Sequence, residues 1–169
     1  MDDSRISKWC LEGNEQAFRD FYREQSPKLW KFLVARGCDR DLAYDLLAEA
    51  FLKFIQNVCH DPREPVALLY RIAINLRIDA FRRDQANPTT ARNPEEIPEL
   101  AQFPESPEVT DIRRLVATLP ESEQNFLLMR YWIGLSHKEV AQALDLPEGT
   151  VRRQCAELLT RLYERLKQE

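Results

Sequence analysis

Apolar residues recur at intervals of three and four along most of this chain, which is the spacing of one face of an α-helix. The clearest stripe runs without a break from Ala43 to Val58. Weaker stripes predict three more helices in the same half of the chain: Ala17–Tyr22, Pro27–Gly37, and Pro65 to about Arg83. The alternation of apolar and polar residues that predicts β-strands does not occur. The pattern therefore predicts an all-α fold.

A stretch without apolar periodicity divides the chain into two parts. Five of the ten prolines lie between Pro88 and Pro107, among polar and acidic residues. Such a composition is typical of an extended linker. We therefore predict a helical domain over residues 1–84, a flexible linker over residues 85–107 and a second helical domain over residues 108–169.

Helical spacing returns after the linker and predicts a helix-turn-helix unit. One helix is expected to end at Pro120, and a second to run over Glu121–Trp132. The S-x-x-E pattern at Ser136–Glu139 is a capping box that begins a short helix, and a last helix begins at Glu148 after a tight turn. Two helices joined in this way are typical of a helix-turn-helix, whose second helix enters the DNA major groove.

The last helix would present basic side chains to DNA. Its apolar stripe is expected to face inward, which leaves Thr150, Arg152 and Arg153 facing outward. An arginine can contact a guanine edge or a phosphate through two hydrogen bonds. Thr150 can donate to a phosphate at the helix N-terminus, where free backbone N–H groups also favour anions. The alternative is a plain helical hairpin with a solvated arginine pair.

The net charge of −4 argues against a protein that coats nucleic acid through diffuse positive charge. The charge is unevenly distributed, however. Residues 1–85 are balanced, residues 86–111 carry one basic and six acidic side chains, and residues 112–169 carry nine basic and eight acidic ones. Because the acidity lies in the linker, DNA binding is not excluded. It is expected to be weak and sensitive to salt until a partner holds both domains together.

The sequence offers no pattern for catalysis or metal binding. Cys10, Cys38, Cys59 and Cys155 lie far apart without a C-x-x-C pair, so we expect four reduced, mostly packed thiols. Only Cys59 and His60 are neighbours, and adjacent residues on a helix point in different directions. No nucleophile–base pair is apparent. We therefore expect no enzyme activity, no catalytic residue, no cofactor and no metal.

The sequence also lacks signals for export or membrane insertion. No stretch approaches the roughly 18 apolar residues that a membrane span needs. The first residues are acidic, whereas a secretion signal begins with basic residues. We therefore expect a cytoplasmic protein without a membrane span.

Two blocks of the sequence resemble one known family. The segments L-P-E-S-E at 119–123, G-L-S at 134–136 and G-T-V at 149–151 resemble the promoter −35-binding domain of sigma-70 family initiation factors. Their spacing is similar to that of the extracytoplasmic-function (ECF) group. In the first domain, D-L-L-A-E-A-F at 45–51 resembles the polymerase-binding helix of that group, and L-Y-R-I-A-I-N at 69–75 resembles its −10-recognition helix. The similarity covers roughly residues 9–84 and 108–167.

The resemblance implies a sigma factor that binds core RNA polymerase, recognises −10 and −35 promoter elements and promotes DNA melting. The implied polymerase contacts on the Asp45–Phe54 helix are Asp45, Glu49 and Phe51. The implied −10 contacts follow the His60–Pro65 loop and are Tyr70, Arg71, Asn75, Arg77, Arg82 and Arg83. The alternative function is a stand-alone helix-turn-helix transcriptional regulator, which would not need a polymerase-binding helix.

The resemblance also implies partners and shows departures from the family pattern. The partners are core RNA polymerase, promoter DNA and an anti-sigma factor or other inhibitor. The two domains would close around that inhibitor or on each other and so hide the Asp45–Phe54 helix. Four positions differ from the usual residue, which is given in parentheses: Ala48 (Gln), Leu68 (Trp), Gln124 (Arg) and Glu157 (basic).

Overall fold

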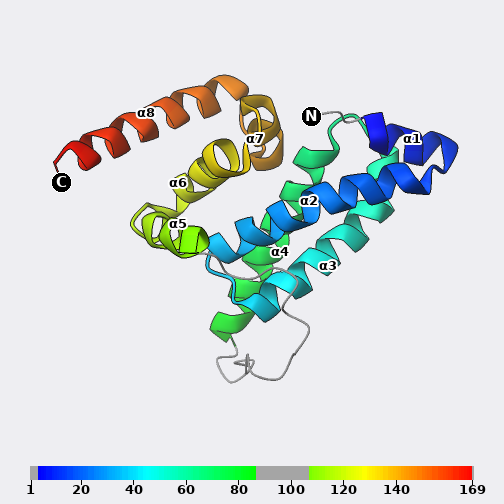
Figure 1. The fold of residues 1–169 in the computed structure, drawn as a ribbon, viewed down its shortest axis with the longest axis horizontal. Coiled ribbons are helices and arrows are strands. Elements are labelled where there is room, and N and C mark those ends of the chain that lie inside the picture. Colours follow the sequence, from blue (N-terminus) through cyan, green and yellow to red (C-terminus); the bar gives the residue numbers. More distant parts are fainter. Residues whose placement is uncertain (1–3, 87–106, 169) are drawn as a thin grey trace.

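The computed structural model describes residues 4–86 and 107–168, and these form helices and turns without any strand. The prediction of an all-α fold is confirmed for this part of the chain. The first half contains α1 (Ser4–Glu12), α2 (Glu15–Ala35), α3 (Arg40–Asn57), the short 3₁₀ helix η1 (Val58–His60) and α4 (Pro65–Ala86) (Figure 1). Most of the predicted linker lies outside the described residues. Its first residues continue α4, and its last residue begins the next helix.

Helix α2 corrects the prediction of two separate segments, because it continues through Pro27. A proline inside a helix costs about 3 kcal/mol. The residues after it include Leu29, Trp30 and Leu33, which are almost completely buried. Each such burial contributes about 1.5–3 kcal/mol, so the packed face outweighs the proline. Helix α1 was not predicted at all, and it is held by the fully buried Ile6.

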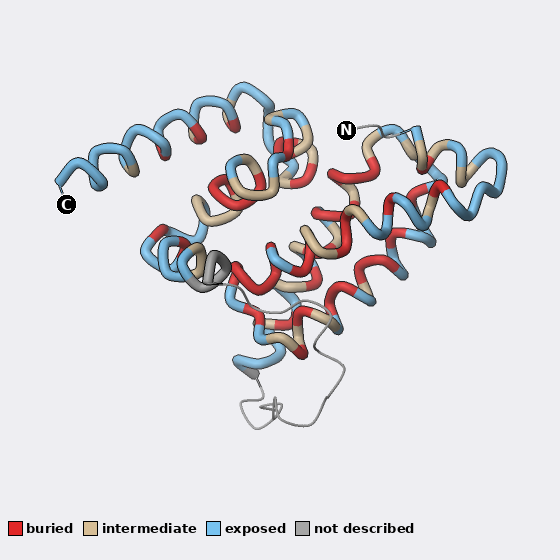
Figure 2. The backbone as a smooth tube through the Cα atoms, viewed as in Figure 1, coloured by how far each residue is buried: buried red, intermediate tan, exposed pale blue. Residues whose placement is uncertain are grey.

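The core of the first half packs α2, α3 and α4 against one another. The rings of Phe21 and Phe54 stack with centroids 5.3 Å apart, which joins α2 to α3. Local signals set the helix ends. Asp39 caps α3 by accepting a hydrogen bond from the Leu42 N–H at 2.8 Å. Figure 2 shows the buried faces of α2, α3 and α4 turned toward one another.

The second half forms α5 (Pro107–Ala117), α6 (Glu121–Phe126), the π-helical segment η4 (Leu127–Ile133), α7 (His137–Leu144) and α8 (Glu148–Lys167). The single helix expected over Glu121–Trp132 therefore widens into π-helical turns part of the way along. The capping box is confirmed, since the Ser136 hydroxyl accepts from the Glu139 N–H at 3.0 Å and the Glu139 carboxylate accepts from the Ser136 N–H at 2.9 Å. Helices α7 and α8 form the predicted helix-turn-helix.

The structure corrects the expectation of four unpaired thiols. Cys10 of α1 and Cys59 of η1 form a disulfide with Cα atoms 5.4 Å apart, whereas Cys38 and Cys155 are free and buried. The two bonded cysteines are separated by 49 residues in sequence. They meet because α1 packs against α2 and η1. Local cysteine spacing contains no information about such a pairing.

The two halves of the described chain lie against each other. Helix α2 contacts α5 and η4, and α4 contacts α7. Figure 1 shows α7 near the start of α4, and α5 near the end of α2. Within residues 4–86 and 107–168, we find no helix with the length and apolar character needed to span a membrane.

Candidate nucleic-acid interface

The candidate −10 residues on α4 fall into three environments. Arg71, Asn75, Arg82 and Arg83 are exposed. Tyr70 is fully buried, and its ring packs edge-on against Phe32 with centroids 5.3 Å apart. Burial also raises the pKa of the Tyr70 hydroxyl. The implied DNA contact of Tyr70 stays a prediction, and in this arrangement its side chain lies in the core with those of Leu69 and Ala73.

Arg77 of α4 is half-buried and holds the fold together. Its Nε and Nη2 atoms donate to the carbonyl oxygen of Arg36 at 3.0 Å and 2.6 Å. Its guanidinium also lies 4.4 Å from the centroid of the Phe81 ring. These contacts tie α4 to the end of α2. Burial lowers the pKa of Arg77. The structure thus gives Arg77 a structural role that its place in the sequence motif did not indicate.

A cavity of about 540 Å³ lies between the turn before α4, the first turns of α4 and α7. Both signs of charge line it. Lys138 of α7 lies 3.0 Å from the carboxylate of Glu64, and the Arg71 guanidinium donates to the main-chain oxygen of Gln142. Leu68, at the position where the family usually has tryptophan, is part of the lining. The predicted −10 surface is thus in contact with the helix-turn-helix.

The turn before α4 carries its own ion pair. Arg63 donates to both carboxylate oxygens of Asp61 at 2.8 Å and 2.9 Å. These hydrogen bonds lower the pKa of Asp61 to about 2. The turn thus keeps a charged pair at its exposed tip at any physiological pH.

The first turns of α8 present the candidate −35 residues as the sequence predicts. Val151, Cys155 and Leu158 are buried on the inner face. Arg152 and Arg153 are exposed, and Thr150 is half-buried. Arg152 donates to the carboxylate of Glu148 at 2.7 Å, one helical turn earlier. Because this pair is exposed, it stabilises the helix little and leaves Arg152 able to exchange Glu148 for a phosphate or a base.

The outer face of α3 differs from the implied polymerase site. Asp45 is exposed and Glu49 half-buried, as expected for a contact surface. Phe51 is buried, because its ring packs edge-on against Tyr22 with centroids 4.8 Å apart. Two apolar residues that the sequence stripe did not assign to this surface lie on it instead: Leu52 is 62% exposed and Ile55 is 39% exposed. Their spacing from Asp45 is the only sequence signal for them, since residues seven and ten positions apart share a helical face.

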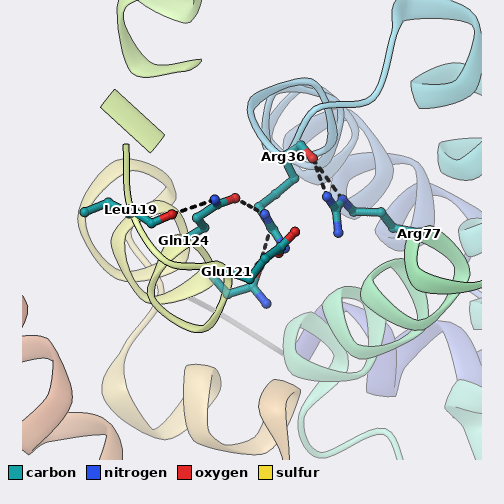
Figure 3. A network of polar contacts seen from close by, with 6 residues as sticks. Arg36, Arg77, Leu119, Glu121 and Gln124 are labelled. Atoms are coloured by element: carbon teal, nitrogen blue, oxygen red, sulfur yellow. Dashed lines mark hydrogen bonds and ion pairs between the residues drawn. The ribbon is translucent and has the colours of Figure 1, made fainter. Parts of the chain in front are cut away.

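Arg36 joins the two halves of the chain, and sequence reasoning did not identify it. Its side chain is only 5% exposed. It donates to the Glu121 carboxylate at 2.8 Å, to the Asn125 side-chain oxygen at 2.8 Å and to the Gln124 side-chain oxygen. The Gln124 amide in turn donates to the Leu119 carbonyl at 3.0 Å (Figure 3). All three acceptors belong to α6, so this arginine bonds across the contact between the two halves.

Comparisons with known proteins match both halves of the chain. Residues 21–87 match the family model described as Sigma-70 region 2, and residues 110–162 match Sigma-70, region 4. The chain is 29% identical over 161 residues to the ECF RNA polymerase sigma factor RpoE of Cereibacter sphaeroides, covering 90% of this chain and 88% of the relative. It is 25% identical to the ECF sigma factor SigW of Bacillus subtilis, covering 86% of each.

A solved structure shows the same fold. CnrH, in its complex with the cytosolic domain of CnrY, superposes with a TM-score of 0.68 and 18% sequence identity. The match covers 99% of both chains, so the similarity of fold is not confined to one domain.

Proposed function

This chain belongs to the sigma-70 family, within it to the ECF sigma factors, and from this premise we propose which of its residues carry the function. As an ECF sigma factor it directs RNA polymerase to promoters, and the family is not enzymatic. A stand-alone helix-turn-helix regulator would not need region 2, so the match to that region decides against the alternative.

The −35 element is proposed to bind the first turns of α8. The supporting observation is the exposure of Arg152 and Arg153 at the leading end of a helix whose inner face is buried. Each arginine that reads a base is typically worth ~1–3 kcal/mol. We expect Arg152→Ala and Arg153→Ala to weaken binding of polymerase holoenzyme to promoter DNA roughly 5- to 150-fold. Lys167→Ala, which removes the same charge at the far end of α8, is the matched control. Equal losses in all three variants would indicate a general effect of charge and refute the assignment.

The −10 element is proposed to bind α4 and the turn before it. Arg71, Asn75, Arg82 and Arg83 are exposed along this helix and can contact phosphates or an unstacked base. Tyr70 and Arg77 are left out because their side chains hold the core. Permanganate footprinting of the melted strand tests this proposal. Asn75→Ala is expected to reduce melting without changing the affinity for core polymerase, whereas Arg19→Ala at an exposed position of α2 is expected to change neither.

Core polymerase is proposed to bind the outer face of α3. Acidic and apolar groups share that face, with Asp45 and Glu49 beside Leu52 and Ile55. An exposed apolar patch rimmed by charge is typical of a protein-binding surface. We expect Leu52→Asp to reduce core binding at least tenfold in a fluorescence anisotropy titration, a loss of ~1.4 kcal/mol. Leu11→Asp on α1, which is more exposed, is the matched control. Run-off transcription on a pool of genomic promoters then tests the whole function.

The observed arrangement is proposed to be a closed resting state. In it Arg71 bonds to α7 and Arg36 bonds to α6, so region 4 covers part of the proposed −10 surface. The face of α3 stays exposed, so closure hides a different surface from the one expected from the sequence. The similarity to CnrH bound to the CnrY cytosolic domain favours an inhibitory protein partner that holds this arrangement.

A further inference from the structure

The one covalent link between distant segments of the described chain joins α1 to the turn before α4. Cys10 lies near the end of α1, and Cys59 lies in η1, directly before the His60–Glu64 turn. That turn lines the cavity beside α7, and its Glu64 pairs with Lys138. The bond is therefore placed where a change in its state would act on the proposed −10 surface.

The four cysteines differ in their access to solvent. Cys59 is exposed and Cys10 is half-buried. Cys38 and Cys155 are buried, and burial raises the pKa of the Cys38 thiol to about 11 and that of Cys155 above its ordinary value. Oxidation selects thiols that are exposed and easily ionised. The pair on α1 and η1 is thus the accessible one, and the two buried cysteines serve as internal controls.

Other contacts besides this bond hold α1 in the fold. Ile6 of α1 is fully buried, the centroid of the Trp9 ring lies 4.8 Å from that of Phe18, and Arg5 forms an ion pair with Glu24. These contacts would hold α1 in place with both thiols reduced. Within the described residues no group of three or more His, Cys, Asp or Glu side chains is arranged to hold a metal ion. The two cysteines are therefore suited to a reversible redox change and not to a metal site.

We propose that Cys10 and Cys59 form a redox-modification site that responds to peroxides and, when oxidised, favours the closed arrangement of the two domains. The Cys59 thiolate attacks one oxygen of hydrogen peroxide, an S–O bond forms as the O–O bond breaks, and Cys59 becomes a sulfenic acid; the hydroxide that leaves takes up the proton that the Cys59 thiol lost on ionisation and becomes the first water. The Cys10 sulfur then attacks the Cys59 sulfur, which forms the disulfide and releases the second water. A dithiol reductant reverses the change by exchange and is itself oxidised to a disulfide.

The effect on function follows from the order of the turn. The bond fixes η1 against α1, so the turn that begins one residue later has less freedom. A turn that is already ordered loses less entropy when Glu64 docks on Lys138, and docking becomes more favourable. Oxidation should therefore oppose separation of region 4 from α4 and slow promoter opening. This consequence rests on the proposed role of α4 and its turn.

The test uses the full chain with core RNA polymerase. The reduced protein is treated with hydrogen peroxide, the peroxide is removed, and free thiols are alkylated before peptide mass spectrometry. Open-complex formation is measured by permanganate footprinting before oxidation, after oxidation and after addition of a dithiol. The expected results are a Cys10–Cys59 cross-linked peptide with Cys38 and Cys155 still alkylated after denaturation, and a roughly fivefold loss of open complex that the dithiol reverses.

Cys10→Ser supplies the matched variant, because it keeps the exposed Cys59 but removes its partner. Cys10→Ser is expected to form open complex at one rate in two conditions: before peroxide treatment, and after peroxide treatment followed by addition of the dithiol. Failure to form the cross-link, or a cross-link that leaves promoter opening unchanged or faster, overturns the proposal. Equal and dithiol-resistant inhibition of Cys10→Ser overturns it as well. If the reduced protein fails to open any promoter, the proposed role of α4 fails, whereas the cross-linked peptide still reports on the redox site.

Discussion

One arginine makes several of the bonds between the two domains, and its removal can be tested separately from the contacts of α4 with α7. The Arg36 side chain bonds only to acceptors on α6 among the hydrogen bonds described, while its main-chain oxygen receives Arg77. Arg36→Ala therefore removes the bonds from this side chain to α6 and keeps the main-chain bond that positions α4. Hydrogen bonds to a charged donor are worth about 1.5–3 kcal/mol each. Their sum overstates the loss, because Glu121 is 75% exposed and regains water when the domains separate.

We therefore expect Arg36→Ala to weaken domain docking by about 2–3 kcal/mol, a factor of about 30–150 in the closed population. Amide hydrogen exchange of the full chain measures it directly. The segments of α4 and α7 that face each other should exchange faster, whereas the core of α2 and α3 should not change. Arg19→Ala is the control, since within residues 4–86 and 107–168 the one ion pair that Arg19 forms is with Glu15, one turn earlier on α2.

A second variant tests the same reasoning by addition instead of removal. Gln124→Arg introduces the residue that the family usually has at this position, and it would place a second guanidinium against Arg36. Two guanidinium groups held close together repel each other. We therefore expect the two domains to separate in Gln124→Arg at least as much as in Arg36→Ala. If neither variant changes the exchange of α7 or of the start of α4, the Arg36 contacts do not hold the domains together and the closed resting state is refuted.

Three further predictions concern pH, stability and thiol chemistry. The hydrogen bond from Arg36 lowers the pKa of Glu121. The contribution of this bond to docking is therefore fully present above the ordinary pKa of 4.5 and is lost as the pH falls below that value. Small-angle scattering across pH 6 to 3 should show an expansion of the chain that is smaller in Arg36→Ala. Ser136→Ala removes a side-chain cap and should lower the free energy of unfolding by ~1 kcal/mol in urea titrations, with Ser122→Ala at an exposed position of α6 as a control. Reduction of the Cys10–Cys59 bond, which closes a 49-residue loop, should lower the unfolding free energy by up to about 4 kcal/mol, and an unchanged urea midpoint would contradict the pairing.

Most of the helices could be predicted from the sequence because they bury one continuous face. The stripe of α3 and the capping box of α7 are local signals, and both led to the observed elements. Helix α1 and the continuation of α2 through Pro27 could not be predicted, since both depend on burial against other helices. The same limit applies to the disulfide, which depends on how α1 packs.

In the candidate site, the sequence motifs predicted which residues share a helix, but not always which way their side chains point. Sequence motifs placed Arg152, Arg153 and Asn75 on exposed helical faces, and the structure agrees. Tyr70 and Phe51 belong to the same motifs but are buried, because a motif records which residues share a helix and not which of them face the core. Ile55 shows the reverse error, since its place in the apolar stripe predicts a buried side chain and it is 39% exposed.

Two of the four residues that depart from the family pattern lie at the contact between the domains. Gln124 accepts a hydrogen bond from Arg36, where an arginine would repel it. Leu68 lines the cavity between α4 and α7, and a tryptophan there would add a large ring to the space that separates them. Each departure removes an obstacle to bringing region 4 onto α4. Departures at positions where local reasoning fails are expected at functional contacts. The departures at Gln124 and Leu68 therefore favour the closed arrangement that we propose for this chain.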